Sequence, residues 1–190
     1  MNRVGFRRAL TVCAFAAAGC LSALPARADD MKDNPKYQAW AKFKPGSNST
    51  IATDIEAGPN KIHLEITRTL ISVTDKEAVI ESVTTVNMMG QDHKQPPTRE
   101  TIPVQIGKDQ IKSTDDKDVE AMGKTFKCKV WEAAGDPDAK PQAHAAPGMD
   151  PSKKAVIYAS DEVPGGIVKI EATGRGDKQV VFLLTAMEAK

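Results

Sequence analysis

The chain has 190 residues, of which 41% are hydrophobic and 27% charged, and its formal net charge is +1. A chain of this length suits one domain with a real hydrophobic core. The near-equal numbers of basic and acidic residues argue against a nucleic-acid-binding surface, which needs clustered Lys and Arg.

The N-terminus has the anatomy of a secretory signal. An arginine-rich head is followed by the mostly apolar run 10–24, and Ala26 and Ala28 stand at the −3 and −1 positions of a cleavage site. The run is shorter than the ~20 apolar residues that span a bilayer. We therefore expect a signal peptide over residues 1–28, no transmembrane segment, and a periplasmic or secreted protein. The alternative is a lipoprotein anchored through Cys20.

The remainder of the chain, residues 29–190, is expected to be a single exported domain. Four of the 26 basic residues and none of the 25 acidic residues lie in the signal, which leaves 22 basic against 25 acidic and a net charge of −3. This mild acidity argues against binding to nucleic acid or to anionic lipid surfaces. Cys128 is the one cysteine that remains, so burial rather than a disulfide must hold the fold.

A short helix is predicted over residues 34–47. Asn34 can cap its N-terminus, Pro35 suits the first helical position, and a Pro-Gly pair ends it. Tyr37 and Trp40 lie three positions apart and share one face of this helix. We expect this aromatic face to pack on apolar residues, because so short a helix is marginal alone.

Alternating apolar and polar residues predict about eight strands after the helix. The segments are 50–57, 61–73, 77–89, 101–106, 124–133, 155–160, 166–174 and 179–187. Short turns or loops join consecutive strands, so we expect antiparallel pairing, and such a sheet must twist and curl. The prediction is a mainly β (α+β) fold, a curved antiparallel sheet or half-barrel of about eight strands around the short N-terminal helix.

The sequences of individual strands allow more specific predictions. A phase slip within 61–73 indicates a bulge near residues 68–70. Pro103 lacks an N–H group, which places its strand at a sheet edge or a bulge. The segment 179–187 is apolar on both faces and is therefore expected to be covered on both sides.

Three segments lack a clear strand pattern. Residues 89–98 are predicted to form a loop, and the acidic segment 109–123 a loop with a possible short strand. Residues 135–154 contain four prolines in twenty positions, which predicts a mobile Pro-rich loop. This loop is expected to lie between two strands of the single β-rich domain rather than between two domains.

The segment "SDEVPGG", residues 160–166, allows two interpretations. Asp161 and Glu162 are paired carboxylates, which can hold Ca²⁺ or act as acid and base. The structural interpretation is a type II turn, with Pro164 at its second position and Gly165 supplying the positive φ at its third. Apolar strands on both sides favour the turn.

Two other segments have chemical interpretations that are weaker than their structural ones. His63 and Glu65 form an i, i+2 pair that could begin a zinc site, but no supporting third ligand has suitable spacing. Cys128 alternates in phase with apolar neighbours, so we expect a buried thiol rather than a nucleophile. A hydrolase built on His63 with the acids of "SDEVPGG" is a third-ranked hypothesis, and no catalytic or cofactor-binding fingerprint occurs in the chain.

The order of signal peptide, aromatic helix and successive strands resembles the periplasmic lipoprotein-carrier (LolA/LolB-like) half-barrel superfamily. The segments "GKTFKCKVWEA" and "VIYASDEVPGGIVKIEA" resemble the part of such proteins where a Pro-containing turn joins neighbouring strands. The chain is also similar to exported bacterial proteins with W-x-x-F-K-P-G-S early and D-E-V-P-G-G-x-V-K late, here residues 40–47 and 161–169. The resemblance implies a concave apolar surface that holds an acyl chain or another hydrophobic ligand.

Two functions of different classes are expected from these observations. The first is a non-enzymatic exported binding protein that holds a hydrophobic or lipid-like ligand in its half-barrel, lined by Trp40, Phe43 and Trp131, without a metal or cofactor. The alternative is a structural or envelope-associated interaction module, which binds a protein partner through strand edges or the Pro-rich loop and has no small ligand.

Overall fold

The computed structural model describes residues 31–57, 60–107, 112–133, 153–174 and 178–190. The predicted signal peptide and most of the predicted Pro-rich loop lie outside these residues. The elements are α1 (Pro35–Ala41), β1 (Met31–Asp33), β2 (Asn48–Ala57), β3 (Asn60–Val73), β4 (Glu77–Met88), β5 (Gln91–Lys94), β6 (Thr98–Pro103), β7 (Gln105–Gly107), β8 (Lys112–Ala121), β9 (Lys124–Ala133), β10 (Ala155–Ala159), β11 (Ile167–Thr173) and β12 (Gln179–Glu188). Among the described residues, no helix is long and apolar enough to cross a membrane.

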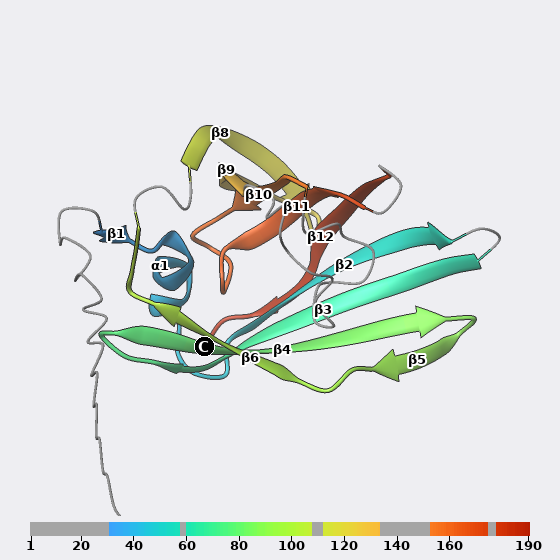
Figure 1. Cartoon of the computed structure of the whole chain (residues 1–190), viewed down its shortest axis with the longest axis horizontal. Coiled ribbons are helices and arrows are strands. Elements are labelled where there is room, and N and C mark those ends of the chain that lie inside the picture. Colours follow the sequence, from blue (N-terminus) through green and yellow to red (C-terminus); the bar gives the residue numbers. More distant parts are fainter. Residues whose placement is uncertain (1–30, 58–59, 108–111, 134–152, 175–177) are drawn as a thin grey trace, which may run out of the picture.

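Ten strands form one antiparallel sheet in the order β5-β4-β3-β2-β12-β11-β10-β9-β8, with β6 beside β5 along the same edge of β4. The strands β1 and β7 form a separate pair. The sheet is curved but not closed into a barrel: β2–β6 lie on one side, β8–β12 on the other, and α1 lies between them at one end (Figure 1). This confirms the predicted curved antiparallel sheet, with more strands than expected.

The core has two parts, because the curved sheet and the helix each bury an apolar face. The larger cluster lies between the two sides of the sheet and contains Ile51, Leu64, Ala121, Phe126, Cys128, Val130, Tyr158, Val163, Val168, Val180, Phe182 and Leu184. The smaller cluster joins α1 to β3, β4 and β6 and contains Tyr37, Trp40, Leu70, Ala78, Ile80 and Ile102. The aromatic face of the helix therefore packs on the sheet, as its spacing predicts.

Asn34 caps α1, as predicted, and also anchors it to the sheet. Its Oδ1 accepts a hydrogen bond from the N–H of Lys36 at 3.0 Å, while its Nδ2 donates to the carbonyl of Pro103 at 2.8 Å. Its own N–H donates to the carbonyl of Val104 at 2.8 Å. The chain leaves the edge strand β6 here, so the strand predicted over 101–106 is interrupted at Val104 and continues as β7.

Two segments predicted to be loops contain strands. Within 89–98, β5 pairs with β4, and β8 occupies ten residues of the acidic segment 109–123. All four residues of β5 are exposed, so no apolar alternation marks this strand in the sequence. The loop prediction was wrong for 89–98, and the strand in 109–123 is longer than expected.

Both strands are joined to a neighbour by a two-residue Met-Gly turn. Met89 and Gly90 have φ values of 54° and 79°, and Met122 and Gly123 have 54° and 71°. Positive φ at both central residues is the geometry of the type I′ turn, whose twist matches that of a tight hairpin. Methionine is an unusual first residue for this turn, so neither hairpin is marked by a typical turn pair in the sequence.

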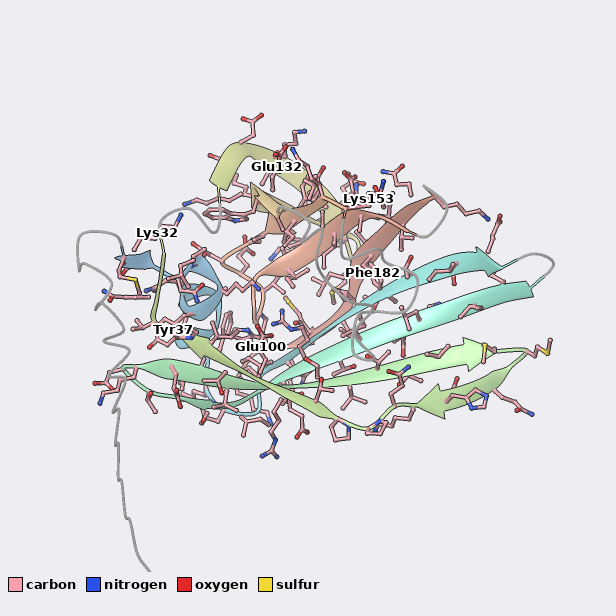
Figure 2. The ribbon with its side chains drawn as sticks, viewed as in Figure 1. Lys32, Tyr37, Glu100, Glu132, Lys153 and Phe182 are labelled. Carbon is pink, nitrogen blue, oxygen red and sulfur yellow. The ribbon has the colours of Figure 1, made fainter. Side chains whose placement is uncertain are left out.

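The last strand is covered less completely than predicted. Val180, Phe182 and Leu184 are buried on one face of β12, and Phe182 lies between the two sides of the sheet (Figure 2). On the other face Val181 is 37% exposed and Leu183 is half-buried. The expected full cover on both faces was therefore wrong.

The bulge expected in β3 is present, although slightly later in the chain. The pairing of β3 with β4 shifts between Leu70 and Ser72, just after the predicted position at residues 68–70. The shift lets Leu70 stay buried while Ile71 is 38% exposed. The tight turn that follows is closed by a hydrogen bond from the N–H of Thr74 to the carbonyl of Glu77, at 2.9 Å.

Candidate functional site on the concave side of the sheet

The "SDEVPGG" segment forms the turn that was predicted from its Pro-Gly pair. The N–H of Gly166 donates to the carbonyl of Val163 at 2.7 Å, and Gly165 has a φ of 76°, as a type II turn requires. The carbonyl of Pro164 accepts a hydrogen bond from the buried hydroxyl of Ser49 at 2.8 Å. The turn therefore closes over the inner face of β2.

The same turn packs directly on α1. The N–H of Gly165 donates to the carbonyl of Ala39 at 3.1 Å. A Cβ atom added at Gly165 would lie 2.4 Å from Cζ2 of Trp40, a distance that real Cβ contacts do not show. Glycine is thus required here both by the turn and by the indole that lies against it.

The three residues predicted to line a ligand hollow occupy different environments. Trp40 is 0% exposed in the core beneath α1, and Phe43 is half-buried against the same cluster. Trp131 is half-buried on β9 and lines a groove on the opposite side of the helix. The helix thus fills one part of the hollow, and the three side chains do not form a single lining.

The groove beside α1 has a volume of about 870 Å³. Its walls come from four parts of the chain: α1 with Asp33 and Lys42 near its two ends, the middle of β8, the middle of β9, and the end of β10 with the turn that follows it. Its charged lining is mixed, with five acidic side chains (Asp33, Asp116, Asp118, Asp161 and Glu162) and four lysines (Lys42, Lys117, Lys127 and Lys129). This differs from the mostly apolar lining of common small-molecule sites.

Ion pairs connect the turn to both walls of the groove. Lys42, which directly follows α1, contacts Asp161 at 3.0 Å, and Lys124 at the start of β9 donates a hydrogen bond to Glu162. Asp161 is 80% exposed, so its ion pair contributes little to stability. The two adjacent carboxylates are therefore paired with different lysines, on different elements, rather than with each other.

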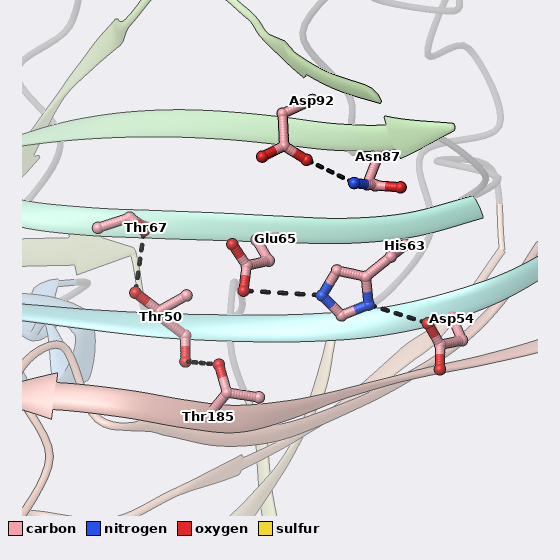
Figure 3. A network of polar contacts seen from close by, with 8 residues as sticks. All are labelled: Thr50, Asp54, His63, Glu65, Thr67, Asn87, Asp92 and Thr185. Carbon is pink, nitrogen blue, oxygen red and sulfur yellow. Dashed lines mark hydrogen bonds and ion pairs between the residues drawn. The ribbon is translucent and has the colours of Figure 1, made fainter. Parts of the chain in front are cut away.

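His63 does not join these acids. It lies on the outer face of β3, where its Nδ1 is 2.9 Å from Oδ1 of Asp54 and its Nε2 is 3.6 Å from Oε1 of Glu65 (Figure 3). Threonine and amide contacts from Thr50, Thr67, Thr185, Asn87 and Asp92 continue this exposed polar face. In the described part of the chain, no group of three or more His, Cys, Asp or Glu side chains is placed to hold a metal ion.

The Asp54–His63 pair is expected to make stability depend weakly on pH. The hydrogen bond to Asp54 raises the pKa of His63, and the same bond lowers the pKa of Asp54. The stabilisation from His63 is fully present below its unfolded pKa of about 6.5 and is lost as pH rises through the higher folded value. The stabilisation from Asp54 is lost only in acid, as pH falls through its folded pKa.

We therefore expect the free energy of unfolding to fall by less than ~1 kcal/mol from pH 5.5 to pH 8.5 through this exposed pair. Urea unfolding of the H63Q variant at both pH values measures the effect, because it removes the titrating ring. The H93Q variant, altered on the exposed strand β5, is the control. An unchanged pH difference in H63Q would refute this assignment.

Cys128 is buried, as its phase with Phe126 and Val130 predicts, at 2% exposed. The pKa of the thiol is raised to about 11, first by burial and then by the nearby Asp118 and Glu162 carboxylates. The reactive thiolate is therefore scarce at neutral pH, and reagents reach it poorly. These observations argue against a nucleophilic role.

Thiol labelling of the native protein at pH 7.5 should be at least about a hundredfold slower than labelling in denaturant, given the raised pKa and the burial. An exposed cysteine introduced by the T101C substitution on the edge strand β6 is the control and should react rapidly. Equally fast labelling of Cys128 in both states would contradict its burial.

Arg68 is the charged residue that sequence reasoning missed. Its side chain is 15% exposed, its guanidinium lies 5.7 Å from the ring centroid of Trp40, and it is 3.6 Å from Oε2 of Glu100. Burial lowers its pKa, although the Glu100 charge opposes that shift. Arg68 lies on the same face of β3 as Leu64 and Leu70. The alternation of β3 already places this charged residue on the apolar face, so the sequence contains the signal that could have identified it.

The inner face of β2, β3 and β4 carries four rows of side chains that lie opposite one another across the strands. Starting nearest the helix, they are Ser49–Arg68–Ser82, Ile51–Ile66–Thr84, Thr53–Leu64–Val86 and Ile55–Ile62–Met88. We call the last three the inner apolar rows. The strand β12 pairs with β2 only as far as Ala52. The two rows that contain Thr53 and Ile55 therefore lie beyond that pairing.

The row farthest from the helix, Ile55–Ile62–Met88, is the most exposed of the inner apolar rows. In the two rows nearer the helix, Ile51, Thr53 and Leu64 are buried, and Ile66, Thr84 and Val86 are half-buried. In the farthest row Ile55 and Ile62 are half-buried and Met88 is 43% exposed, so the accessible apolar surface lies at the tip of the sheet.

No protein-family model and no curated protein sequence match the chain. Among solved structures, the hypothetical protein CT021 from Chlamydia trachomatis aligns with 84% of this chain and 93% of its own, at 9% identity and a TM-score of 0.42.

Proposed function

We propose that this chain is an exported, non-enzymatic binding protein that holds a hydrophobic or lipid-like ligand against the concave side of its half-barrel. The observation that carries the proposal is the row Ile55–Ile62–Met88, which continues the apolar core along the curved sheet and stays partly exposed. Apolar concave surfaces with a few polar groups are typical of ligand sites. The charged groove beside α1 has a different character and is a poor match for such a ligand.

The proposal is tested by native mass spectrometry and by organic extraction of the full chain after expression in a bacterium. Copurified lipid, or saturable binding of added single-chain lipids, is the expected result. Fractionation of the same cells should place the protein in the periplasm or medium, and detergent partitioning distinguishes a form anchored through Cys20. A protein that is recovered empty and that binds no added lipid would refute the ligand proposal.

A second function, a protein-interaction module, is favoured by the position of β8. This strand ends the sheet order, so one of its edges has no strand partner among the described residues, and its middle residues line the charged groove. Unpaired edges can accept an added strand from another chain. Crosslinking in envelope fractions tests this: partners lost in a D116P variant of β8 would support it, and unchanged partners would refute it.

A further inference from the structure

We propose, on the basis of the second function proposed above, that β8 binds an extended protein segment with Lys or Arg at every second position, as an added strand of the sheet. The strand β8 ends the sheet order, and among the described residues no strand pairs with the edge that faces away from β9 (Figure 1). We call this edge the outer edge of β8. Backbone hydrogen bonds hold an added strand at such an edge, and side chains decide which strand is accepted.

The turn between β8 and β9 determines which backbone groups point toward the outer edge. A two-residue hairpin turn is flanked by a hydrogen-bonded pair, which here is Ala121 with Lys124. In an antiparallel ladder such pairs recur at every second residue. The pairing is regular from Ala121 back to Asp115, so every second residue counted back from Ala121 directs its N–H and C=O groups to β9.

The residues between them direct their N–H and C=O groups to the outer edge. These residues are Asp116, Asp118 and Glu120, and all three have acidic, exposed side chains. Because they are spaced by two along the strand, their side chains lie on one face. The outer edge therefore offers its free backbone groups together with one row of negative charge.

This row of charge borders the groove beside α1. Asp116 and Asp118 line the groove, and Lys129 and Lys127 stand directly opposite them on β9. Among the described residues, neither aspartate makes an ion pair. A strand added at the outer edge would place its own side chains directly opposite these aspartates on their other side. Lys or Arg at those positions gives favourable cross-strand pairs.

A second copy of the chain is a poor partner for this edge. Antiparallel pairing of β8 with β8 would join outward-facing residues of one copy to outward-facing residues of the other. Every such pair would place Asp or Glu opposite Asp or Glu, and like charges that face each other are destabilising. The acids therefore disfavour self-association through β8 and select a strand whose alternate residues are basic.

The other face of β8 describes the residues between the basic positions of the partner. On this face Lys117 is exposed and Val119 is half-buried. An acidic residue suits the position opposite Lys117, and an apolar residue suits the position opposite Val119. The partner segment is thus an alternating strand rather than a block of basic residues.

The experiment adds three synthetic peptides to the full chain and follows amide hydrogen exchange by NMR. The first is Thr-Lys-Val-Lys-Val-Lys-Thr, the second has Glu in place of each Lys, and the third, Thr-Lys-Lys-Lys-Val-Val-Thr, has the composition of the first in blocks. Without peptide, the N–H groups of Lys117 and Val119 should exchange slowly and those of Asp116, Asp118 and Glu120 quickly. The alternating lysine peptide, at ten times its Kd, should slow the three outward groups about tenfold.

A variant that carries both D116N and D118N tests the charge selection. It should bind the alternating lysine peptide about two- to thirtyfold more weakly, which corresponds to the loss of two cross-strand charge pairs. D115N is the matched control, because Asp115 is also exposed but lies on the other face of β8. It should leave the Kd of the peptide nearly unchanged.

The outcomes separate this inference from the function on which it rests. Equal binding of the alternating and the block lysine peptides would overturn the added strand, because the two peptides have the same charge. Equal binding of the glutamate peptide, or normal binding of the lysine peptide to the D116N and D118N variant, would overturn the charge selection. If no peptide binds while envelope partners are still lost in D116P, the inference fails and the interaction function stands. If the partners are unchanged as well, both fail.

Discussion

A G165A substitution is expected to lower the free energy of unfolding by about 3–4 kcal/mol, which combines left-handed backbone strain with overpacking. The added methyl group would lie 2.4 Å from Cζ2 and 2.6 Å from Cε2 of Trp40. Neither partner can easily move, because the turn is hydrogen-bonded to Ala39 and the indole is fully buried. Urea unfolding followed by circular dichroism measures the loss.

The matched control is G90A, in the Met-Gly turn after β4. Gly90 has nearly the same φ, 79° against 76°, but an added Cβ would have no neighbour within 4 Å. It should therefore show only the backbone cost of roughly 1–2 kcal/mol. Equal losses for the two variants would show that contact with Trp40 does not constrain the turn.

The second large effect is expected from W40A, with a loss of about 3–5 kcal/mol, the usual range for removing a fully buried large aromatic side chain. Trp40 joins Leu70 and Ile80 of the sheet to the helix and stacks against Arg68. Truncation also leaves the guanidinium without the ring that covers it. Such a loss is a large part of the free energy of unfolding of a typical domain, so the W40A variant is expected to be partly unfolded at 37 °C.

W131A is the matched variant for the other predicted lining residue. Trp131 is only half-buried at the groove, so its truncation should cost clearly less than that of Trp40 and leave the fold intact. Thermal unfolding of the two variants side by side provides the comparison. If W40A were as stable as W131A, the placement of Trp40 in the core would be refuted.

Much of the fold could be predicted because its signals are local. Asn34 and Pro35 mark the start of the helix, the Pro-Gly pair of "DEVPGG" fixes a turn type, and long strands such as β3 and β9 alternate clearly. Each of these features depends on backbone preference or on a solvent-facing side of the sheet. The curvature of the sheet followed from the number of antiparallel strands that one core had to accommodate.

The strand β5, which was missed, and β8, which was expected only as a possible short strand, carry no apolar alternation. The strand β5 is exposed throughout, and β8 has the charged sequence "KSTDDKDVEA"; both lie at sheet edges, where charged side chains hinder unwanted pairing. Their existence depends on the neighbouring strand that supplies the hydrogen bonds. A pattern confined to the segment itself does not contain that information.

The candidate site was harder to predict for a related reason. The break in the pattern of β3 was attributed to a bulge near Arg68, and this explanation concealed a charged residue in the apolar phase. Trp40, Phe43 and Trp131 were expected to line a ligand hollow, whereas the structure places Trp40 completely buried and Trp131 at the groove on the other side of the helix. Spacing predicts which side chains share the buried face of a helix, but whether that face fills the hollow or lines an open pocket depends on how the helix docks, which is a tertiary property.

The two Met-Gly turns have a consequence for chemical ageing. Met89 and Met122 are 83% and 48% exposed, and both stand at hairpin tips away from the two core clusters. Oxidants convert accessible thioethers to polar sulfoxides, which damage a protein chiefly when the sulfur belongs to its core. At these tips the sulfoxide would meet water, so the two methionines are sites where peroxide reacts early while the packing of the sheet persists.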